Sequence, residues 1–500
     1  MDTLNYLLQG FGVAITPMNL MWCFIGCFFG TVIGILPGLG PAATIAMLLP
    51  LTFQMEPTSA LIMLGGIYYG SKYGGSTTSI LLNVPGESAS VVTCLDGYEM
   101  AKKGRGGPAL GIAAIASFVA GTLGVIGLML IAPPLAKFGL SFSSPEYFGL
   151  MALGLAMVVL LAGESMVKAL LSMLVGLWIA GMGTDLFTST SRFTFGSAEL
   201  LDGIDFVVVA IGIFALGEVL SNMETKGAAQ IVPVPKGLRN LMPSWQDLKD
   251  CRFAFLNGSV VGFIIGVLPG AGSTIASFIS YGIEKSLSKH PQKFGTGIPE
   301  GVAAPEGANN AETGGALVPM LTLGIPGSGT TAILLAALIL WGLKPGPLMI
   351  QENPQLFWGL VASMYIGNVM LLVLNLPLVP LFAQILRLPT YVLFPVIFGI
   401  SIIGVYNVST SLFDVWMLAG FGLVGYLMRR LDYPSAPLIL GLVLGDAMER
   451  ALRQSLMMSQ GDLSILVSRP ISAVMIGLTV LILIAPIFRR ANAWRMKALG

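Results

Sequence analysis

The sequence carries very little charge for its length. Only 10% of its 500 residues are Asp, Glu, Lys or Arg, whereas 55% are hydrophobic and the mean hydropathy is +0.84. Soluble domains carry roughly 25% charged residues, so this chain has too little charge to cover several water-facing domains. The 26 basic residues also balance the 25 acidic ones, which leaves no large single-sign field to attract nucleic acid. These shortages exclude a soluble enzyme and a nucleic-acid binder.

The residues needed for common enzyme chemistries are also scarce. His290 is the only histidine, and the four cysteines have no metal-ligand spacing to it. The patterns G-x-x-x-x-G-K-[ST] and H-E-x-x-H do not occur, so neither P-loop ATP hydrolysis nor zinc-dependent hydrolysis is expected. The sequence therefore predicts no enzyme, no cofactor and no transition-metal site. No basic residue precedes Lys72, so a cleavable signal peptide is not expected either.

Glycine and proline, by contrast, are abundant. The chain has 63 Gly and 30 Pro, yet it is too apolar to be a disordered low-complexity protein. The composition predicts an all-α polytopic membrane protein with about 11–14 membrane segments, whose helices are repeatedly broken or closely packed. The scattered glycines of Gly111–Gly127 are best explained by close helix packing.

Eleven apolar stretches are candidate membrane spans, for which roughly 20 residues are needed. They are Leu20–Leu36, Gly111–Ala132, Tyr147–Ala162, Val167–Gly183, Ile204–Leu220, Phe253–Leu268, Phe357–Phe382, Val392–Tyr406, Phe413–Met428, Ala436–Gly445 and Ile471–Phe488. Two further stretches, Thr44–Phe53 and Thr274–Ile283, are too short to cross. We expect them to be half-helices or re-entrant segments, which at membrane depth must line a cavity or lie inside the protein.

Basic residues predict the orientation in the membrane. Most of them fall in loops or at the C-terminus that we expect to be cytoplasmic: Lys102, Lys103, Arg105, Lys226, Lys236, Arg239, Lys249, Arg252, Lys285, Lys289, Lys293, Arg429, Arg430, Arg489, Arg490, Arg495 and Lys497. The N-terminus lacks Lys and Arg and is expected outside. Arg450, Arg453 and Arg469 fit this scheme least well, because the number of preceding spans places residues 447–469 outside.

Two halves of the chain resemble each other. Gly34-Ile-Leu-Pro37-Gly38-Leu-Gly40 recurs as Gly266-Val-Leu-Pro269-Gly270-Ala-Gly272. Asn83-Val-Pro85-Gly86-Glu87-Ser88 is matched by Gly324-Ile-Pro326-Gly327-Ser328-Gly329, and Gly107-Pro108 by Gly346-Pro347. Because three landmarks recur in the same order, we predict an internal repeat.

Equivalent loops of the two halves differ in basic character. The loop Gln54–Ser59 has no Lys or Arg, whereas its counterpart contains Lys285, Lys289 and Lys293. This difference predicts inverted-topology repeats. The expected organisation is a first transmembrane repeat at 1–223, a cytoplasmic linker at 224–252, a second, inverted repeat at 253–446, and an extra helix with a basic tail at 447–500.

The Pro-Gly pairs indicate where a ligand binds. Such a pair inside an apolar run ends a helix, and the freed backbone groups can coordinate ions. Paired, interrupted segments in inverted repeats point to a transporter's substrate site; the alternative is that small residues only allow close packing. We predict substrate contacts at Pro37, Gly38, Gly40, Lys72, Asn83, Pro85, Gly86, Ser88, Pro269, Gly270, Gly272, Pro326, Gly327 and Ser328. We predict cation contacts at Thr77, Thr78, Glu306, Asn309, Asn310, Glu312 and Thr330.

The charged candidates allow two interpretations. Lys72 lies in an uncharged run, where a cation is costly and usually functional. It either pairs with a substrate carboxylate or extends to the membrane interface. Glu87 is either a cation ligand or an N-cap carboxylate. Glu306 and Glu312 flank Asn309-Asn310 and are candidates for binding Na⁺ or a proton.

The motifs resemble one known family. Gly34–Gly40, the segment ending Ile80-Leu-Leu-Asn83-Val-Pro85-Gly86, and Pro305-Glu306-Gly-Ala-Asn309-Asn310-Ala-Glu312 through Pro326-Gly327 are similar to the large membrane subunit of tripartite tricarboxylate transporters. The resemblance extends from about residue 18 to about residue 445. It implies a bacterial inner-membrane, cation-coupled importer of carboxylates with a small membrane subunit of about four helices and a periplasmic solute-binding protein. It also implies that the Pro-Gly loops line the substrate and cation sites, at Pro37, Gly38, Asn83, Pro85, Gly86, Asn309, Asn310, Pro326 and Gly327. Lys72 departs from the small or apolar residue expected there.

Together these observations predict the transport subunit of a secondary transporter that imports tricarboxylates, dicarboxylates or aromatic acids with Na⁺ or H⁺. The alternative is a carboxylate channel or an exporter without ion coupling. Channel pores usually use rings of like residues from symmetric subunits, whereas the breaks here are paired within one chain. An intramembrane enzyme would need a nucleophile–base pair or a metal set, which the sequence does not offer.

Overall fold

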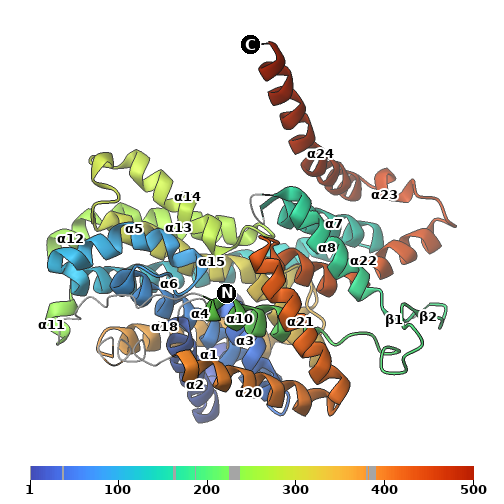
Figure 1. Cartoon of the computed structure of the whole chain (residues 1–500), viewed down its shortest axis with the longest axis horizontal. Helices are drawn as coiled ribbons and strands as arrows, with labels where there is room; N and C mark the ends of the chain where they lie inside the picture. The colour runs from blue at the N-terminus through green and yellow to red at the C-terminus, as the bar shows by residue number, and fades with distance from the viewer. Residues whose placement is uncertain are drawn as a thin grey trace.

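The protein is almost entirely helical in the computed structural model (Figure 1). The structure describes residues 2–36, 39–161, 165–185, 187–224, 237–378, 381 and 390–499. The first half contains α1 (Asp2–Ala14), α2 (Pro17–Gly34), α3 (Pro41–Leu48), η1 (Leu49–Thr52), α4 (Pro57–Leu82), η2 (Ser88–Ser90), α5 (Val91–Met100), η3 (Ala101–Arg105), α6 (Gly106–Gly139), α7 (Ser144–Leu161), α8 (Met166–Ala180), β1 (Gly183–Thr184), β2 (Ser191–Arg192), α9 (Phe206–Ala210), η4 (Ile211–Leu216) and α10 (Gly217–Met223).

The second half repeats this helical character. It contains α11 (Leu238–Leu241), α12 (Trp245–Asp250), α13 (Arg252–Val267), α14 (Gly272–Leu287), η5 (Pro291–Lys293), α15 (Glu300–Leu323), α16 (Gly329–Leu340), α17 (Met349–Glu352), α18 (Pro354–Asn375), α20 (Thr390–Ser409), α21 (Leu412–Arg430), α22 (Ser435–Met458), α23 (Ile465–Ser468) and α24 (Pro470–Leu499). In Figure 1, α24 extends away from the other helices.

Several helices are long and apolar enough to cross a membrane. Within the described residues there are six such segments: Pro17–Gly34, Ser88–Gly139, Ser144–Leu161, Phe206–Met223, Pro354–Asn375 and Leu412–Arg430. Shorter apolar helices of 10–17 residues accompany them, including the predicted half-helix at residues 41–52. The chain is therefore an all-α, multi-pass membrane protein, as its composition predicts.

Glycines pack in a similar way in both halves of the chain. Helix α2 packs along α4, and α13 packs along α15 in the same way. A Cβ atom on Gly74 would lie 2.9 Å from the Gly34 carbonyl carbon, and one on Gly315 would lie 3.0 Å from the Gly266 Cα. Such approaches require small residues on both helices. The two halves thus share local architecture, while the inversion of one half relative to the other stays a prediction.

Two helix boundaries differ from the sequence-based expectation, and two long helices lie outside the predicted spans. Helices α4 and α15 were not predicted as spans and are not among the six segments above, because glycines and polar residues lower their hydropathy. Helix α14 has 16 residues rather than ten. Helix α22 continues well past Gly445 to Met458, since the charged side chains of its second half find carboxylate or arginine partners.

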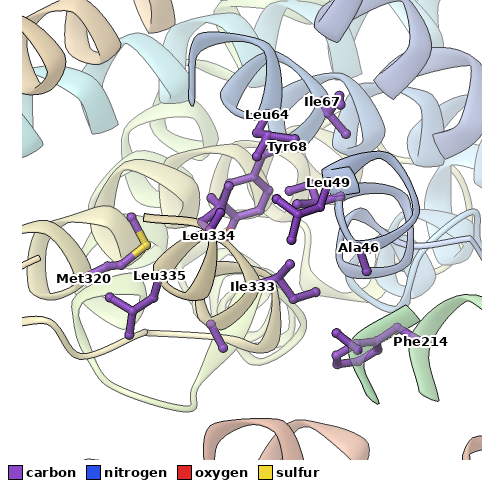
Figure 2. Packing of buried hydrophobic residues seen from close by; sticks show 14 of the residues in the cluster. Ala46, Leu49, Leu64, Ile67, Tyr68, Phe214, Met320, Ile333, Leu334 and Leu335 are labelled. Carbon is purple, nitrogen blue, oxygen red and sulfur yellow. The ribbon is translucent and has the colours of Figure 1, made fainter. Parts of the chain in front are cut away.

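Apolar residues from both halves form one core. Figure 2 shows Leu49 of η1, Tyr68 of α4 and Leu334 of α16 close together, with Met320 of α15 and Phe214 of η4 on opposite sides of them. All five side chains are buried. Interiors packed to this extent resist changes of even one methylene group, so the core holds α4 and α15 in fixed relation.

The basic loops predicted to share the cytoplasmic side lie together. The Arg105 guanidinium is 2.6 Å from the Asp247 carboxylate, and the Lys103 ammonium donates to the Thr296 carbonyl. These residues and Lys293 line one cavity of about 1260 Å³. The three loops therefore face the same side, although the side itself stays a prediction.

The arginines of residues 447–469 are paired with carboxylates. Arg450 pairs with Asp446, and Arg453 lies 2.8 Å from Asp185. Arg469 lies 2.5 Å from Glu146 of α7. All three arginines are therefore paired within the fold, and the side on which residues 447–469 lie stays a prediction.

Asp185 holds the hairpin of β1 and β2, and we expect this hold to depend on pH. Backbone amides of Thr188 and Phe187 and the guanidinium of Arg453 lower the pKa of Asp185 to about 2. Unfolded Asp has a pKa of about 3.9, so the stabilisation is present above that value and is lost as the pH falls through about 2. Pepsin at pH 4 should cut D185N in residues 187–203 severalfold faster than the wild type.

The matched control for this prediction is Glu199→Gln, which alters a carboxylate that accepts only a local bond from Ser197. It should be cut at the wild-type rate. Equal cutting of D185N and wild type at pH 4 would contradict the anchoring role.

Candidate functional site

Helices α4 and α15 position the candidate site, and both end in an abrupt break. Helix α4 ends at Asn83, whose φ is 56°, and α15 ends at Gly324, whose φ is 71°. Left-handed backbone favours Gly and tolerates Asn. The Pro-Gly pairs follow directly, so the breaks predicted at Asn83–Gly86 and Gly324–Gly327 are confirmed.

A helix start follows each break. Glu87 caps η2 and Ser328 caps α16, each through a capping box with the residue three positions later. The N-cap interpretation of Glu87 is therefore confirmed. Each half places backbone N–H groups and a polar cap beside the broken backbone, an arrangement that binds anions at helix N-termini.

Lys72 lies at the centre of the site. Its side chain is 0% exposed, and its ammonium is 2.7 Å from Glu312 Oε2 and 2.8 Å from the Asn309 carbonyl oxygen. The Tyr68 hydroxyl donates to the same Glu312 oxygen at 3.2 Å, and the ammonium lies 5.0 Å from the centre of the Tyr68 ring. Lys72 does not extend to the membrane interface, and its carboxylate partner in this structure is Glu312.

Two further carboxylates are buried beside this pair. Glu306 accepts hydrogen bonds from the hydroxyls of Ser76 and Thr93. Glu87 accepts a hydrogen bond of 2.7 Å from Asn309 Nδ2, and it is close enough to interact electrostatically with Lys72. The site therefore contains three buried carboxylates and one buried ammonium. An unpaired buried carboxylate is costly unless a proton or a cation joins it.

Several oxygen atoms at the centre of α15 lack hydrogen-bond partners. Among the described side chains, Asn309 Oδ1, Asn310 Oδ1, Glu312 Oε1 and Thr313 Oγ1 are buried without a partner. Unpartnered buried polar atoms are rare. Carboxylate, amide and hydroxyl oxygens are the ligands of hard cations, so this face of α15 can hold a cation.

The remaining predicted residues divide into three groups: those near the charged centre, those engaged elsewhere and those that only form the breaks. The first group lies near the charged centre. Gly86 packs against Gly34 and Gly75, and a Cβ on Gly40 would lie 4.0 Å from the Glu87 Cβ, so these breaks lie near the charged centre. Ser88 accepts a hydrogen bond from Thr274 at 2.9 Å. Thr77 and Thr330 are buried.

The second group is engaged elsewhere. The Thr78 hydroxyl donates to the Ile35 carbonyl at 2.7 Å. Gly270 packs against Val158 of α7, although its amide donates to the Gly327 carbonyl at 2.8 Å, and Pro269 approaches Gly154 of the same helix. The sides of Pro269 and Gly270 that face α7 therefore serve helix packing. Pro85, Pro326 and Gly272 belong to the breaks. Pro37 and Gly38 lie outside the described residues.

Four residues of the site were not among the predicted substrate or cation contacts. Tyr68 and Ser76 lie four positions before and after Lys72, so helical spacing alone places them on the face of Lys72. Thr93 lies on α5 and bonds to Glu306; no sequence pattern links it to α15. Ser117 of α6 similarly accepts a hydrogen bond of 2.7 Å from Asn310 Nδ2.

Comparison with known proteins places these features in a family. The family described as "Tripartite tricarboxylate transporter TctA family" matches residues 20–440. A protein of Agrobacterium vitis described as "Uncharacterized 52.8 kDa protein in TAR-I ttuC' 3'region" is 47% identical over 476 residues, which cover 95% of this chain and 94% of the relative. A second Agrobacterium vitis protein, described as "Uncharacterized protein in TAR-II ttuC' 3'region", is 46% identical over 217 residues, covering 43% of this chain and 90% of that protein.

No solved structure matches the chain. The family match covers most of the sequence and includes the broken segments and the buried charged centre. The chain therefore belongs to the tripartite tricarboxylate transporter TctA family and is a membrane component of such a transporter.

Proposed function

We propose that this chain imports small organic carboxylates, namely tricarboxylates, dicarboxylates or aromatic acids, driven by a Na⁺ or H⁺ gradient. This proposal rests on one observation. Three buried carboxylates lie beside a single buried ammonium, where the broken segments meet. Burial makes such an excess costly, so cation binding is favoured there. The adjacent N-terminus of α16, which has the neutral cap Ser328, suits a carboxylate of a substrate.

The family match supports further parts of the proposal. The chain would act in the bacterial inner membrane with a small membrane subunit of about four helices and a periplasmic solute-binding protein. Its units would be the repeat at 1–223, the linker at 224–252, the inverted repeat at 253–446 and the extension at 447–500. The N-terminus would be periplasmic and the C-terminus cytoplasmic. One repeat would move against the other around the buried centre.

Uptake into proteoliposomes tests this function. Vesicles containing the chain and its small membrane subunit would receive labelled citrate, succinate or phthalate, with purified binding protein outside. Saturable uptake of at least one acid is expected under an inward Na⁺ or H⁺ gradient. Unsaturable flux that ignores both gradients would instead favour the channel or uncoupled exporter, and the proposal would fail.

Glu306→Gln should lower gradient-driven uptake in the same assay by about tenfold. The glutamine removes a buried negative charge and exchanges charge-assisted hydrogen bonds for neutral ones, a change of about 1.5 kcal/mol. The loss should appear as a higher cation concentration for half-maximal uptake. Glu199→Gln, at an exposed position after β2, is the matched control and should leave uptake unchanged. An unchanged cation dependence in E306Q would remove Glu306 from the site.

A further inference from the structure

The Lys72 ammonium has the surroundings of a bound cation. Its two hydrogen-bond partners are both oxygens, a carboxylate of Glu312 and a backbone carbonyl of Asn309. These are the ligand types and distances that a monovalent cation would also accept. The side chain is entirely buried, so water does not share the positive charge.

The helix that holds this ammonium has further buried oxygens without partners. Glu312 has a second oxygen, Oε1, without a partner, and Asn309 and Thr313 contribute further unpartnered oxygens. Residues 309, 312 and 313 lie three and four positions apart and so share one face of α15. The oxygen set is thus larger than the lysine needs, as expected for a site that also accepts a free cation.

The other charged groups near Lys72 are held separately. Glu306 is bound by Ser76 and Thr93, and Glu87 by Asn309. Tyr68 contacts the ammonium through its ring and Glu312 through its hydroxyl. Glu312 is therefore the carboxylate that Lys72 neutralises by direct contact.

We propose that Lys72 is a tethered cation, which occupies the coupling-ion site at Glu312 until a substrate carboxylate draws its ammonium away. This inference rests on the proposed function for the identity of the substrate. The four-carbon stem of lysine lets the ammonium move between partners. Glu87 interacts electrostatically with Lys72, and the exposed Ser88 follows it in the broken segment, so an incoming carboxylate would reach Lys72 from this break.

This exchange would couple substrate binding to cation binding directly, because each ligand replaces one partner in the contact between Lys72 and Glu312. Substrate bound to Lys72 leaves Glu312 free for Na⁺ or a proton, and a cation bound at Glu312 frees Lys72 for substrate. By linkage, each ligand must strengthen the binding of the other by the same factor. The empty site stays neutralised by its own lysine.

The first test needs no substrate. The thermal stability of the purified full chain would be followed as NaCl replaces N-methylglucamine chloride at constant ionic strength, and separately as the pH changes without sodium. In K72M the vacated site should bind Na⁺ at a concentration at least tenfold lower than in wild type, or bind a proton at a pH at least one unit higher. K72M/E312Q should lose this response, and Lys137→Met, at an exposed lysine, should match wild type.

Identical Na⁺ and pH responses of K72M and wild type would overturn the proposal. If K72M fails to fold, Lys72→Gln retains a hydrogen-bond donor for Glu312 and Asn309 and should show the same gain. These stability measurements contain no carboxylate substrate. A failure of the uptake assay would therefore refute the proposed function without contradicting the proposed cation site.

A second test concerns the exchange itself. Binding of citrate, succinate and phthalate would be measured by calorimetry with and without Na⁺, and at two pH values. For any acid whose binding to wild type depends on the cation, E312Q should bind that acid with less than a twofold cation effect. Cation dependence retained in E312Q at the wild-type factor would contradict the exchange.

Discussion

Gly86→Ala should destabilise the protein by about 3 kcal/mol, within the upper range for overpacking a tight interior. A Cβ atom at this position would lie 2.4 Å from the Gly34 carbonyl oxygen and 2.5 Å from the Gly75 Cα. Both atoms belong to backbone, so neither can turn aside as a side chain would. We expect a melting temperature several degrees lower, a smaller monodisperse fraction on size-exclusion chromatography and loss of any uptake.

The equivalent glycine and an open position provide graded controls. At Gly327 a Cβ would lie 2.8 Å from the Gly266 carbonyl oxygen, so Gly327→Ala should be harmful but less so. Gly282 of α14 has no atom within 4 Å of a built Cβ, and Gly282→Ala should be neutral or slightly stabilising. If G86A and G282A had the same melting temperature, the close approach of the first break to α2 would be contradicted.

Breaking the buried ion pair is expected to have an equally large effect. Lys72→Met and Glu312→Gln should each lower the free energy of unfolding by about 3–5 kcal/mol in sodium-free buffer, because each leaves an uncompensated charge inside the protein. The double variant K72M/E312Q should recover at least half of that loss. Unfolding by increasing SDS in mixed micelles would measure all three.

The exposed pair Arg450–Asp446, with side chains 48% and 47% exposed, offers a contrast. Arg450→Met should cost no more than about 1 kcal/mol, as is usual for surface pairs. Losses in K72M and E312Q that simply add in the double variant would mean that the two charges do not neutralise each other.

Much of the scaffold was predictable from the sequence. The all-helical class and the breaks at Asn83–Gly86 and Gly324–Gly327 follow from hydropathy and from Pro-Gly pairs, whose backbone limits act locally. Hydropathy does not indicate helices α4 and α15. Their polar residues face each other inside the protein, and a hydropathy window cannot distinguish a buried polar face from one exposed to water.

The site was predictable only in part. Lys72, Glu306, Asn309 and Glu312 stood out as polar residues in apolar surroundings. Their partners did not, because the pairing of Lys72 with Glu312 joins residues 240 positions apart. Thr93 shows the same limit, since a threonine on a short helix carries no local sign that it bonds to Glu306.

The glycine contacts shared by both halves also have an evolutionary consequence. Gly74 and Gly315 are equivalent positions 241 residues apart, and the same offset places Thr313 where the first half has Lys72. In a homodimer of one ancestral half, a lysine at this position would have appeared twice, and so would each glutamate. Within one chain the two positions can differ, so a framework with similar halves can hold a single lysine opposite a single glutamate.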